Sequence, residues 1–186
     1  MKATSKKLAA LNAAKTVRQG GLIAHYTDTL PGIAAHPRLK KSIQSLCRFK
    51  QRQGPFLLLA DSIQTATKQI RFFSPALRRL IKTSWPGPVT IIVQAKPGLS
   101  KQCYNKASMA IRVDASMQTR QLAHACGGLL LSSSLNRRSK GSMIPDRKNQ
   151  YRLHRLLRNR LAGDAGTGKA STILRVWRND STMIRP

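Results

Sequence analysis

Two basic residues separated by a single residue, Lys50 and Arg52, are candidates for binding an anion. They follow a predicted helix and precede a predicted strand, which is the usual place for ligand groups in an α/β sheet. Lysine supplies a point charge and arginine a two-pronged donor, a combination suited to a triphosphate. In a chain this basic, the same spacing is also typical of a solvated surface, so the pair alone is a weak signal.

Hydroxyl and amide side chains gather at the end of an apolar run, in the sequence Ser132-Ser133-Ser134-Leu135-Asn136. Successive residues of a strand face opposite sides, so Ser134 and Asn136, two positions apart, are expected on one side, where they can bind a nucleotide or an amino acid. A capped turn explains the same sequence. Ser171 and Thr172 leave the same two interpretations open.

Other kinds of site are not indicated. Cys47, Cys103 and Cys126 are odd in number and widely spaced, so neither a zinc site nor a disulfide is predicted and reduced thiols are expected. The histidines lack the G-x-S-x-G context of a serine nucleophile, and no metal site is predicted. The segment 163–169 resembles a phosphate loop, but Ala170 stands where that loop needs a hydroxyl residue. It is therefore predicted to be a flexible turn.

The charge of the chain is strongly unbalanced. It has 186 residues with 34 Lys and Arg against 6 acidic residues, all of them Asp, and a formal net charge of +28. Such a charge raises the local concentration of polyanions, so nucleic acid is the expected partner, with a merely solvated basic surface as the alternative. No window approaches the ~20 apolar residues that span a bilayer. Together with reduced thiols, this predicts a cytoplasmic protein without a membrane segment.

The apolar pattern predicts a single α/β domain over residues 1–186, an open mixed sheet flanked by helices. A first helix is expected to be capped by Thr4 or Ser5, to end at Gly20-Gly21 and to bury Leu8, Leu11, Ala14 and Val17. Further helices are predicted over 37–49, 61–70 with Asp61 as cap, 74–83, a segment capped by Asp114 or Ser116, and 149–161. Strands are predicted over 22–26, 56–60, 89–94, 109–113, 128–133, 172–176 and 182–184.

Taken in order, six segments resemble the YrdC/TsaC family, the threonylcarbamoyl-AMP synthases. They are His25-Tyr26-Thr27-Asp28-Thr29, Lys50-Gln51-Arg52, Trp85-Pro86-Gly87-Pro88-Val89-Thr90, Ala110-Ile111-Arg112-Val113, Ser132-Ser133-Ser134-Leu135-Asn136 and Ser171-Thr172-Ile173. The resemblance extends from Val17 to Pro186 and implies a twisted open sheet around a concave basic pocket. It also implies a reaction in which threonine and bicarbonate form a carbamate. The carbamate oxygen then attacks the α-phosphate of ATP, giving threonylcarbamoyl-AMP and pyrophosphate for tRNA modification.

The resemblance implies roles for residues at matching positions. Lys50 and Arg52 are implied to be the catalytic pair, binding phosphate and carboxylate groups. The implied threonine-binding residues are Thr27, Thr29, Arg112, Ser134 and Ser171, and the implied nucleotide-binding residues are Lys50, Arg52, Ser108, Asn136 and Arg185. In-line attack on a phosphoryl group mostly needs positioning and charge neutralisation. Because the chain has no Glu, Mg²⁺ is expected to be held mainly through the ATP phosphates.

The sequence departs from the family pattern beside the implied pocket. Tyr26 and Asp28 flank Thr27 where the family has proline and glutamate. Gln53 stands where proline is expected, and Arg137 begins a basic pair where small residues are expected. The alternative function is therefore a catalytically degraded paralogue that binds double-stranded RNA or rRNA or assists ribosome assembly.

RNA is expected to bind a basic surface separate from the small-molecule pocket. The predicted RNA-binding residues are Lys40, Lys41, Arg48, Arg152, Arg155 and Arg158. The expected macromolecular partners are tRNA or double-stranded RNA and the downstream tRNA threonylcarbamoyl transferase proteins. A basic structural protein of a ribonucleoprotein also fits the charge, but it does not explain the order of the motifs.

Overall fold

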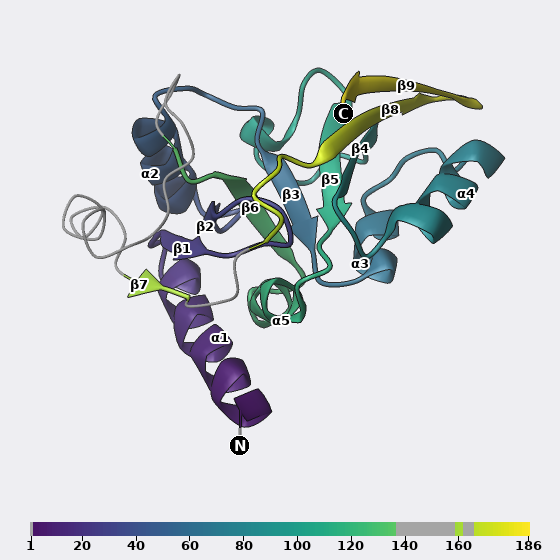
Figure 1. The fold of residues 1–186 in the computed structure, drawn as a ribbon. Helices are drawn as coiled ribbons and strands as arrows, with labels where there is room; N and C mark the ends of the chain where they lie inside the picture. The colour runs from purple at the N-terminus through teal and green to yellow at the C-terminus, as the bar shows by residue number, and fades with distance from the viewer. Residues whose placement is uncertain (1, 137–158, 162–165) are drawn as a thin grey trace.

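The computed structural model describes residues 2–136, 159–161 and 166–186. In these residues the strands form an open sheet in the order β7-β1-β2-β6-β3-β5-β4-β8-β9. Helices lie against both faces (Figure 1). The predicted α/β class with an open mixed sheet is confirmed.

The elements follow the predicted positions closely. The strands are β1 (Ile23–His25), β2 (Gly32–Ala35), β3 (Leu57–Ala60), β4 (Val89–Gln94), β5 (Ser108–Val113), β6 (Leu129–Ser134), β7 (Asn159–Arg160), β8 (Thr172–Trp177) and β9 (Asp180–Arg185). The helices are α1 (Lys2–Arg18), α2 (Lys40–Lys50), α3 (Ile63–Lys68), α4 (Pro75–Ser84) and α5 (Met117–Ala125), with a 3₁₀ turn η1 (Lys101–Cys103).

The sheet mixes both kinds of pairing. β3 runs parallel to β5, β4 to β8 and β1 to β7, while the other neighbours are antiparallel. The sequence did not predict β2, because three of its four residues, Gly32, Ala34 and Ala35, are of types that are depleted in strands. This strand forms because it pairs on one side with β1 and on the other with β6.

Alternation along the central strands divides the core between two faces. Leu58 and Ile111 pack with side chains of α2, α3 and α4 on the first face. Leu59 and Leu130 pack with α1 and α5 on the second face. Farther along the strands, the second face carries polar residues that line a cavity, among them Ser132, two positions after Leu130. The layer of α1 and α5 therefore covers one part of this face and leaves the rest open to a ligand.

The buried face of α1 differs from the prediction. Ala14 and Val17 are buried as expected, but Leu8 and Leu11 are 59% and 44% exposed. The packed positions also include Ala13, because α1 lies against Leu122 and Ala123 of α5 and small side chains let the two helices approach closely. The helix begins at Lys2, so Thr4 and Ser5 lie inside it rather than capping it.

Two other predicted helix boundaries need correction. Ser62, not Asp61, caps α3 by accepting a hydrogen bond from the backbone N–H of Thr65 at 3.1 Å. Asp61 instead pairs with His124, 2.9 Å away. The predicted helix over 149–161 does not extend to its end, because Asn159–Arg160 form β7 beside β1; residues 149–158 lie outside the described residues. For α5, the expected cap Ser116 is confirmed.

Candidate functional site

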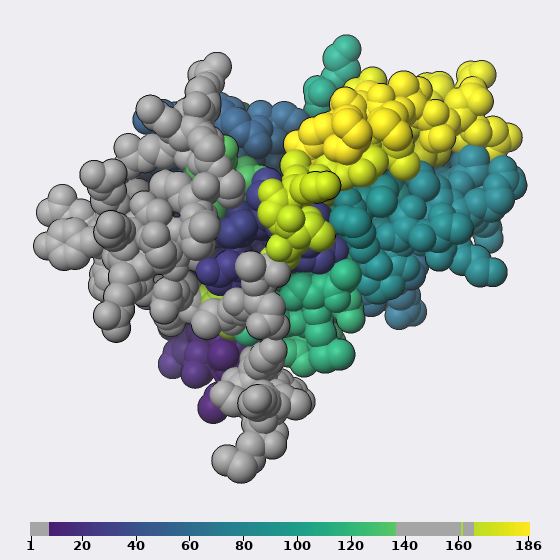
Figure 2. All heavy atoms as spheres, viewed as in Figure 1, coloured from purple at the N-terminus to yellow at the C-terminus, as the bar shows by residue number. Residues whose placement is uncertain are grey.

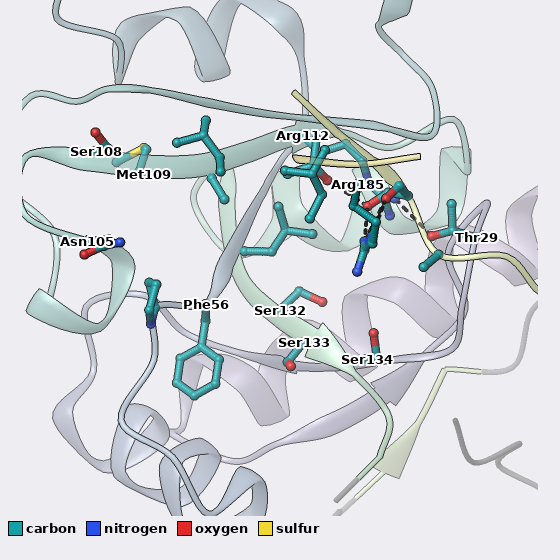
Figure 3. Close-up of a pocket in the computed structure, with 18 of the residues that line it drawn as sticks. Thr29, Phe56, Asn105, Ser108, Met109, Arg112, Ser132, Ser133, Ser134 and Arg185 are labelled. Carbon is teal, nitrogen blue, oxygen red and sulfur yellow. Dashed lines mark hydrogen bonds between the residues drawn. The ribbon is translucent and has the colours of Figure 1, made fainter. Parts of the chain in front are cut away.

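A cavity of about 660 Å³ occupies the open part of the second face. Its floor is made by alternate residues of the central strands, including Thr90 of β4, Arg112 of β5 and Ser132 of β6. In Figure 3, Ser108 lies on the left of the view and Thr29 on the right, with Arg112 between them. The strand periodicity that buries apolar residues on one face thus presents polar residues to the cavity on the other.

One side of the cavity is lined by Thr27, Thr29 and Arg112, and Asp28 and Asp114 lie behind them, paired with Arg112. We call these five residues the closed wall. A directed chain of hydrogen bonds runs through it. Nη1 of Arg112 donates to Oγ1 of Thr29 at 3.0 Å, and the Thr29 hydroxyl lies 2.9 Å from that of Thr27. The Thr27 hydroxyl donates to the carbonyl oxygen of Leu30 at 2.8 Å. Because the hydroxyl proton of Thr27 is donated to the carbonyl oxygen of Leu30, the bond between the two hydroxyls must be donated by Thr29. The orientations of both hydroxyls are therefore fixed.

The charge of Arg112 is balanced within the closed wall. Its side chain is 2% exposed and pairs with Asp114 and, at 3.4 Å, with Asp28. Asp114 also accepts from the backbone N–H of Asp28 at 3.1 Å and of Ser116 at 3.0 Å. Burial raises the pKa of the Asp28 carboxyl, against the opposing effect of Arg112. The two carboxylates neutralise Arg112, so its influence on a ligand passes mainly through the Thr29 hydroxyl.

The other side, which we call the open wall, consists of Arg52, Phe56, Lys106 and Ser108. Nη1 of Arg52 donates to the carbonyl oxygen of Pro55 at 2.8 Å, and its guanidinium carbon lies 4.4 Å from the centre of the Phe56 ring. The left-handed residue Gln51 ends α2 and turns the chain toward the cavity. Arg52 is half-buried and Lys106 exposed, so positive charge on this wall faces the cavity without a carboxylate among its lining residues.

Lys50 lies behind the cavity rather than on its surface. Its side chain is 5% exposed and it is not among the described residues that line the cavity. Its ammonium group donates to the carbonyl oxygen of Ser134 at 2.8 Å, to that of Asn136 at 2.6 Å and to Oδ1 of Asn136. Burial, with a contribution from Arg52, lowers the pKa of Lys50 to about 8. In this structure Lys50 therefore fixes the end of β6, while Arg52 is the cation of the pair that reaches the cavity.

The remaining predicted residues lie around the rim. Oγ of Ser171 is 2.9 Å from Oγ1 of Thr90, and Arg185 donates to the carbonyl oxygen of Ser171 at 2.7 Å through Nη2. Ser134 and Ser108 also line the cavity. Asn136, which does not line it, meets Lys50. The structure thus brings Thr27, Thr29, Arg52, Ser108, Arg112, Ser134, Ser171 and Arg185 to one cavity.

A buried histidine lies directly beneath the cavity and was not predicted. Nε2 of His25 is 3.2 Å from Oγ of Ser132, a cavity residue, and His25 is fully buried. Burial, and then the charge of Arg112, lowers the pKa of His25 to about 4. A Cβ at position 32 would come within 2.8 Å of His25 Nε2, so Gly32 makes room for the imidazole. The signal in the sequence that could have indicated this residue is a histidine inside the apolar strand predicted over 22–26.

The model of the Sua5/YciO/YrdC family, described as "Telomere recombination", matches residues 15–186. A Stenotrophomonas maltophilia protein named threonylcarbamoyl-AMP synthase is 31% identical over 166 residues, which are 87% of this chain and 89% of that protein. This chain belongs to the Sua5/YciO/YrdC family. The predicted resemblance is confirmed.

Solved structures of the Sua5/YciO/YrdC family have the same fold. E. coli YciO superposes with a TM-score of 0.86 at 20% identity, covering 96% of this chain and 89% of that one. P. abyssi Sua5 complexed with L-threonine gives 0.87 at 18% identity, covering 97% of this chain. This chain spans only 54% of that Sua5 chain. At these identities the likeness concerns the fold.

A second hollow, which we call the basic groove, holds part of the predicted RNA surface of this family member. Its volume is about 990 Å³. Its cationic lining residues are Arg38, Lys40, Arg48, Arg52 and Lys101, with no acidic residue in the lining. Lys41 is exposed on the same helix, α2. Arg152, Arg155 and Arg158 lie outside the described residues.

The described residues include no group of three or more His, Cys, Asp or Glu side chains that could hold a metal ion. Cys47, Cys103 and Cys126 are all buried and free. In the described parts of the chain, no helix is long and apolar enough to cross a membrane.

Proposed function

We propose that this protein is an L-threonylcarbamoyladenylate synthase that uses ATP, L-threonine and bicarbonate and supplies its product to tRNA modification. The carbamate oxygen of N-carboxythreonine forms a bond to the α-phosphorus of ATP. The bond from that phosphorus to the bridging oxygen breaks, and pyrophosphate leaves. Family membership and relatives named threonylcarbamoyl-AMP synthase support this reaction.

The observation that carries the proposal is the pairing of two unlike walls in one cavity. The closed wall offers oriented hydroxyls beside buried charge, which suits a small polar amino acid. The open wall offers Arg52 beside an aromatic ring, which suits a nucleotide and its phosphates. A cavity of about 660 Å³ falls within the range usual for small-molecule sites.

At the closed wall, we assign threonine recognition to the hydroxyls. Thr29 presents an oriented oxygen, with Thr27 holding its direction and Arg112 donating to it from below. Ser134 and Ser171 face the same cavity and complete the set predicted from the sequence. Because these groups are held by the protein before a ligand arrives, little ordering is needed on binding.

At the open wall, we assign the triphosphate to Arg52, with Ser108 toward the nucleoside and Arg185 at the opposite rim. Lys50 and Asn136 contribute by holding the β6 end that carries Ser134. Positioning and charge neutralisation are the main requirements of phosphoryl chemistry. Asp28 and Asp114 are engaged with Arg112 and backbone N–H groups, so Mg²⁺ would be held mainly by ATP phosphates and water, where it would neutralise their charge.

The proposal extends to RNA and to cellular location. The basic groove, with five cationic lining residues and no acidic one, suits the phosphate backbone of tRNA or another double-stranded RNA. We place the protein in the cytoplasm, as one domain, handing its product to downstream tRNA threonylcarbamoyl transferase proteins.

The test is pyrophosphate release by the purified protein with ATP, L-threonine and bicarbonate, compared with mixtures that lack one of the three. We expect release only in the complete mixture, with threonylcarbamoyl-AMP detected by mass. Arg52→Ala should lose most of the rate, whereas Arg48→Ala, which removes a cation of α2 outside the cavity, should retain it. A folded protein that releases no pyrophosphate would contradict the proposal and favour an RNA-binding role without catalysis.

A further inference from the structure

A third hollow lies at the opposite end of the sheet, between α4 and the β8–β9 hairpin, and we call it the aromatic groove. Its volume is about 410 Å³, and its lining includes Phe72, Leu77, Val93, Val176, Trp177 and Arg178. Figure 1 shows α4 beside β8 and β9, and Figure 2 shows the two elements meeting at one edge of the molecule. None of the sequence motifs accounts for this groove.

Large aromatic side chains are exposed around this groove. Phe72 is 63% exposed, Trp177 53% and Phe73 36%. These are the exposed phenylalanine and tryptophan residues of the described part of the chain. The other tryptophan, Trp85, is buried and donates its indole N–H to the carbonyl oxygen of Val89. Clustered exposed apolar surface marks an interaction site more often than scattered exposure does.

Arginines accompany these rings. The guanidinium carbon of Arg71 lies 5.5 Å from the centre of the Phe72 ring, and that of Arg78 lies 5.2 Å from the Phe73 ring. Arg178 lines the groove itself. Arg175 and Arg185, also of the β8–β9 hairpin, line the first cavity instead. The groove is therefore aromatic, with Arg178 in its lining and Arg71 and Arg78 over the exposed rings beside it.

We propose that the aromatic groove binds single-stranded nucleic acid, with unpaired bases stacking on Trp177 and Phe72 and phosphates lying against the arginines. Aromatic rings interleaved with cations are the usual platform for single strands, because every base has a flat face to stack. A duplex hides those faces, so it would use only the charges. A second copy of this chain is disfavoured because it would bring a net charge of +28 against the same cations.

Phe72 allows this proposal to be tested separately from the proposed synthase activity. Phe72 lines the aromatic groove but not the cavity, whereas Trp177 lines both. Phe72→Ala should therefore leave pyrophosphate release unchanged while it weakens nucleic-acid binding. Loss of one activity without the other separates failure of this proposal from failure of the proposed function.

The experiment measures the binding of a fluorescein-labelled 12-nucleotide oligouridylate to the full chain by anisotropy. Phe72→Ala and Trp177→Ala should each weaken binding about tenfold, as expected for loss of one stacked base. Trp177→Phe should retain most of the affinity, because a flat ring remains. Met117→Ala, which removes an exposed apolar side chain of α5 outside the groove, is the matched control and should bind like the parent. The oligonucleotide should also quench tryptophan fluorescence in the parent but not in Trp177→Phe, since Trp85 is buried.

Three results would overturn the proposal. The first is that Phe72→Ala and Trp177→Ala both bind the oligonucleotide with the parent's affinity, while their melting temperatures show that both are folded. That result would mean that charge alone binds the strand. The second is that a duplex of the same length binds as tightly as the single strand, and that Trp177→Ala weakens the binding of neither. The third is a parent protein that sediments as a dimer and becomes a monomer in Phe72→Ala without oligonucleotide binding, which would make the groove a contact between copies.

Discussion

The two walls of the cavity use positive charge in opposite ways. On the closed wall, Arg112 is 2% exposed and held by Asp28 and Asp114. On the open wall, Arg52 is half-buried, lies over the Phe56 ring and donates a hydrogen bond to the carbonyl oxygen of Pro55. Charge that is already balanced orients neighbouring hydroxyls, whereas charge without a carboxylate partner can bind an incoming anion. The same residue type therefore shapes the site in one place and binds ligand in the other.

The largest expected effect is a loss of stability, and it tests whether the ion pairs of Arg112 hold the closed wall together. Arg112→Met leaves two carboxylates without their cation, and the loss of one partner of a buried ion pair costs about 3–5 kcal/mol. Urea denaturation should show that loss in the free energy of unfolding. Arg120→Met, which removes a half-buried arginine bonded to backbone carbonyl oxygens, is the control and should cost much less. Arg112→Met/Asp114→Asn should recover part of the loss; equal stability of Arg112→Met and the parent would show that the closed wall is not held by this pair.

Arg52 provides the opposite test, on affinity rather than stability. Arg52→Ala removes an arginine that we assign to the phosphates, so ATP affinity should fall by roughly two decades. Calorimetric titration of ATP measures this, with Arg48→Ala as the matched cation outside the cavity. If Arg52→Ala binds ATP like the parent, the open wall is not the phosphate site.

His25, buried beneath the cavity, predicts a dependence of stability on pH. Unfolded histidine takes a proton near pH 6.5, but folded His25 does so only near 4. Between these values the unfolded state binds more protons, so His25 makes the protein less stable as the pH falls, by up to about 1.4 kcal/mol per pH unit. His25→Gln should flatten this slope in urea melts at pH 4.5 to 6.5, and the half-exposed His36→Gln should change it less. An unchanged slope in His25→Gln would place the acid sensitivity elsewhere.

The smallest effect concerns the basic groove, where the cations are exposed. For tRNA binding, the slope of the logarithm of affinity against the logarithm of salt concentration should become shallower in Lys40→Gln/Lys41→Gln/Arg48→Gln, by up to ~0.9 per lost phosphate contact. The affinity for ATP should stay the same. Lys15→Gln/Arg18→Gln on α1, also exposed, is the control. A triple variant with the parent's salt slope would show that α2 is only a solvated surface.

The sequence predicts most of the fold because apolar periodicity reports burial directly. It places β4 correctly and β3 to within one residue, and it misses β2, whose four residues depend on pairing with two neighbours. The residues of the cavity wall can be predicted from their motifs, but their roles cannot. Lys50 and Arg52 are two positions apart, yet one faces inward to the β6 end and the other faces the cavity. That difference depends on the left-handed turn at Gln51 and on the position of β6.

Asp114 and His25 show the same limit. The sequence indicates Asp114 only as a helix cap, but besides pairing with Arg112 it accepts a hydrogen bond from the backbone N–H of Asp28, 86 residues away. His25 matters because Ser132, 107 residues later in the chain, lies opposite it across neighbouring strands. Contacts between residues so far apart arise from the tertiary fold and leave no local pattern in the sequence.

The most direct test of the two-wall account is the discrimination between threonine and valine, two amino acids of similar shape that differ in a hydroxyl. A wall of oriented hydroxyls should bind threonine, whose own hydroxyl can join the hydrogen bonds of the wall, whereas valine has no group that can do so. In calorimetric titrations of the parent protein without ATP, so that no turnover occurs, we expect threonine to bind at least ~100-fold more tightly than valine. Equal affinities would contradict the account, because they would mean that Thr27, Thr29 and Ser134 do not recognise the amino acid.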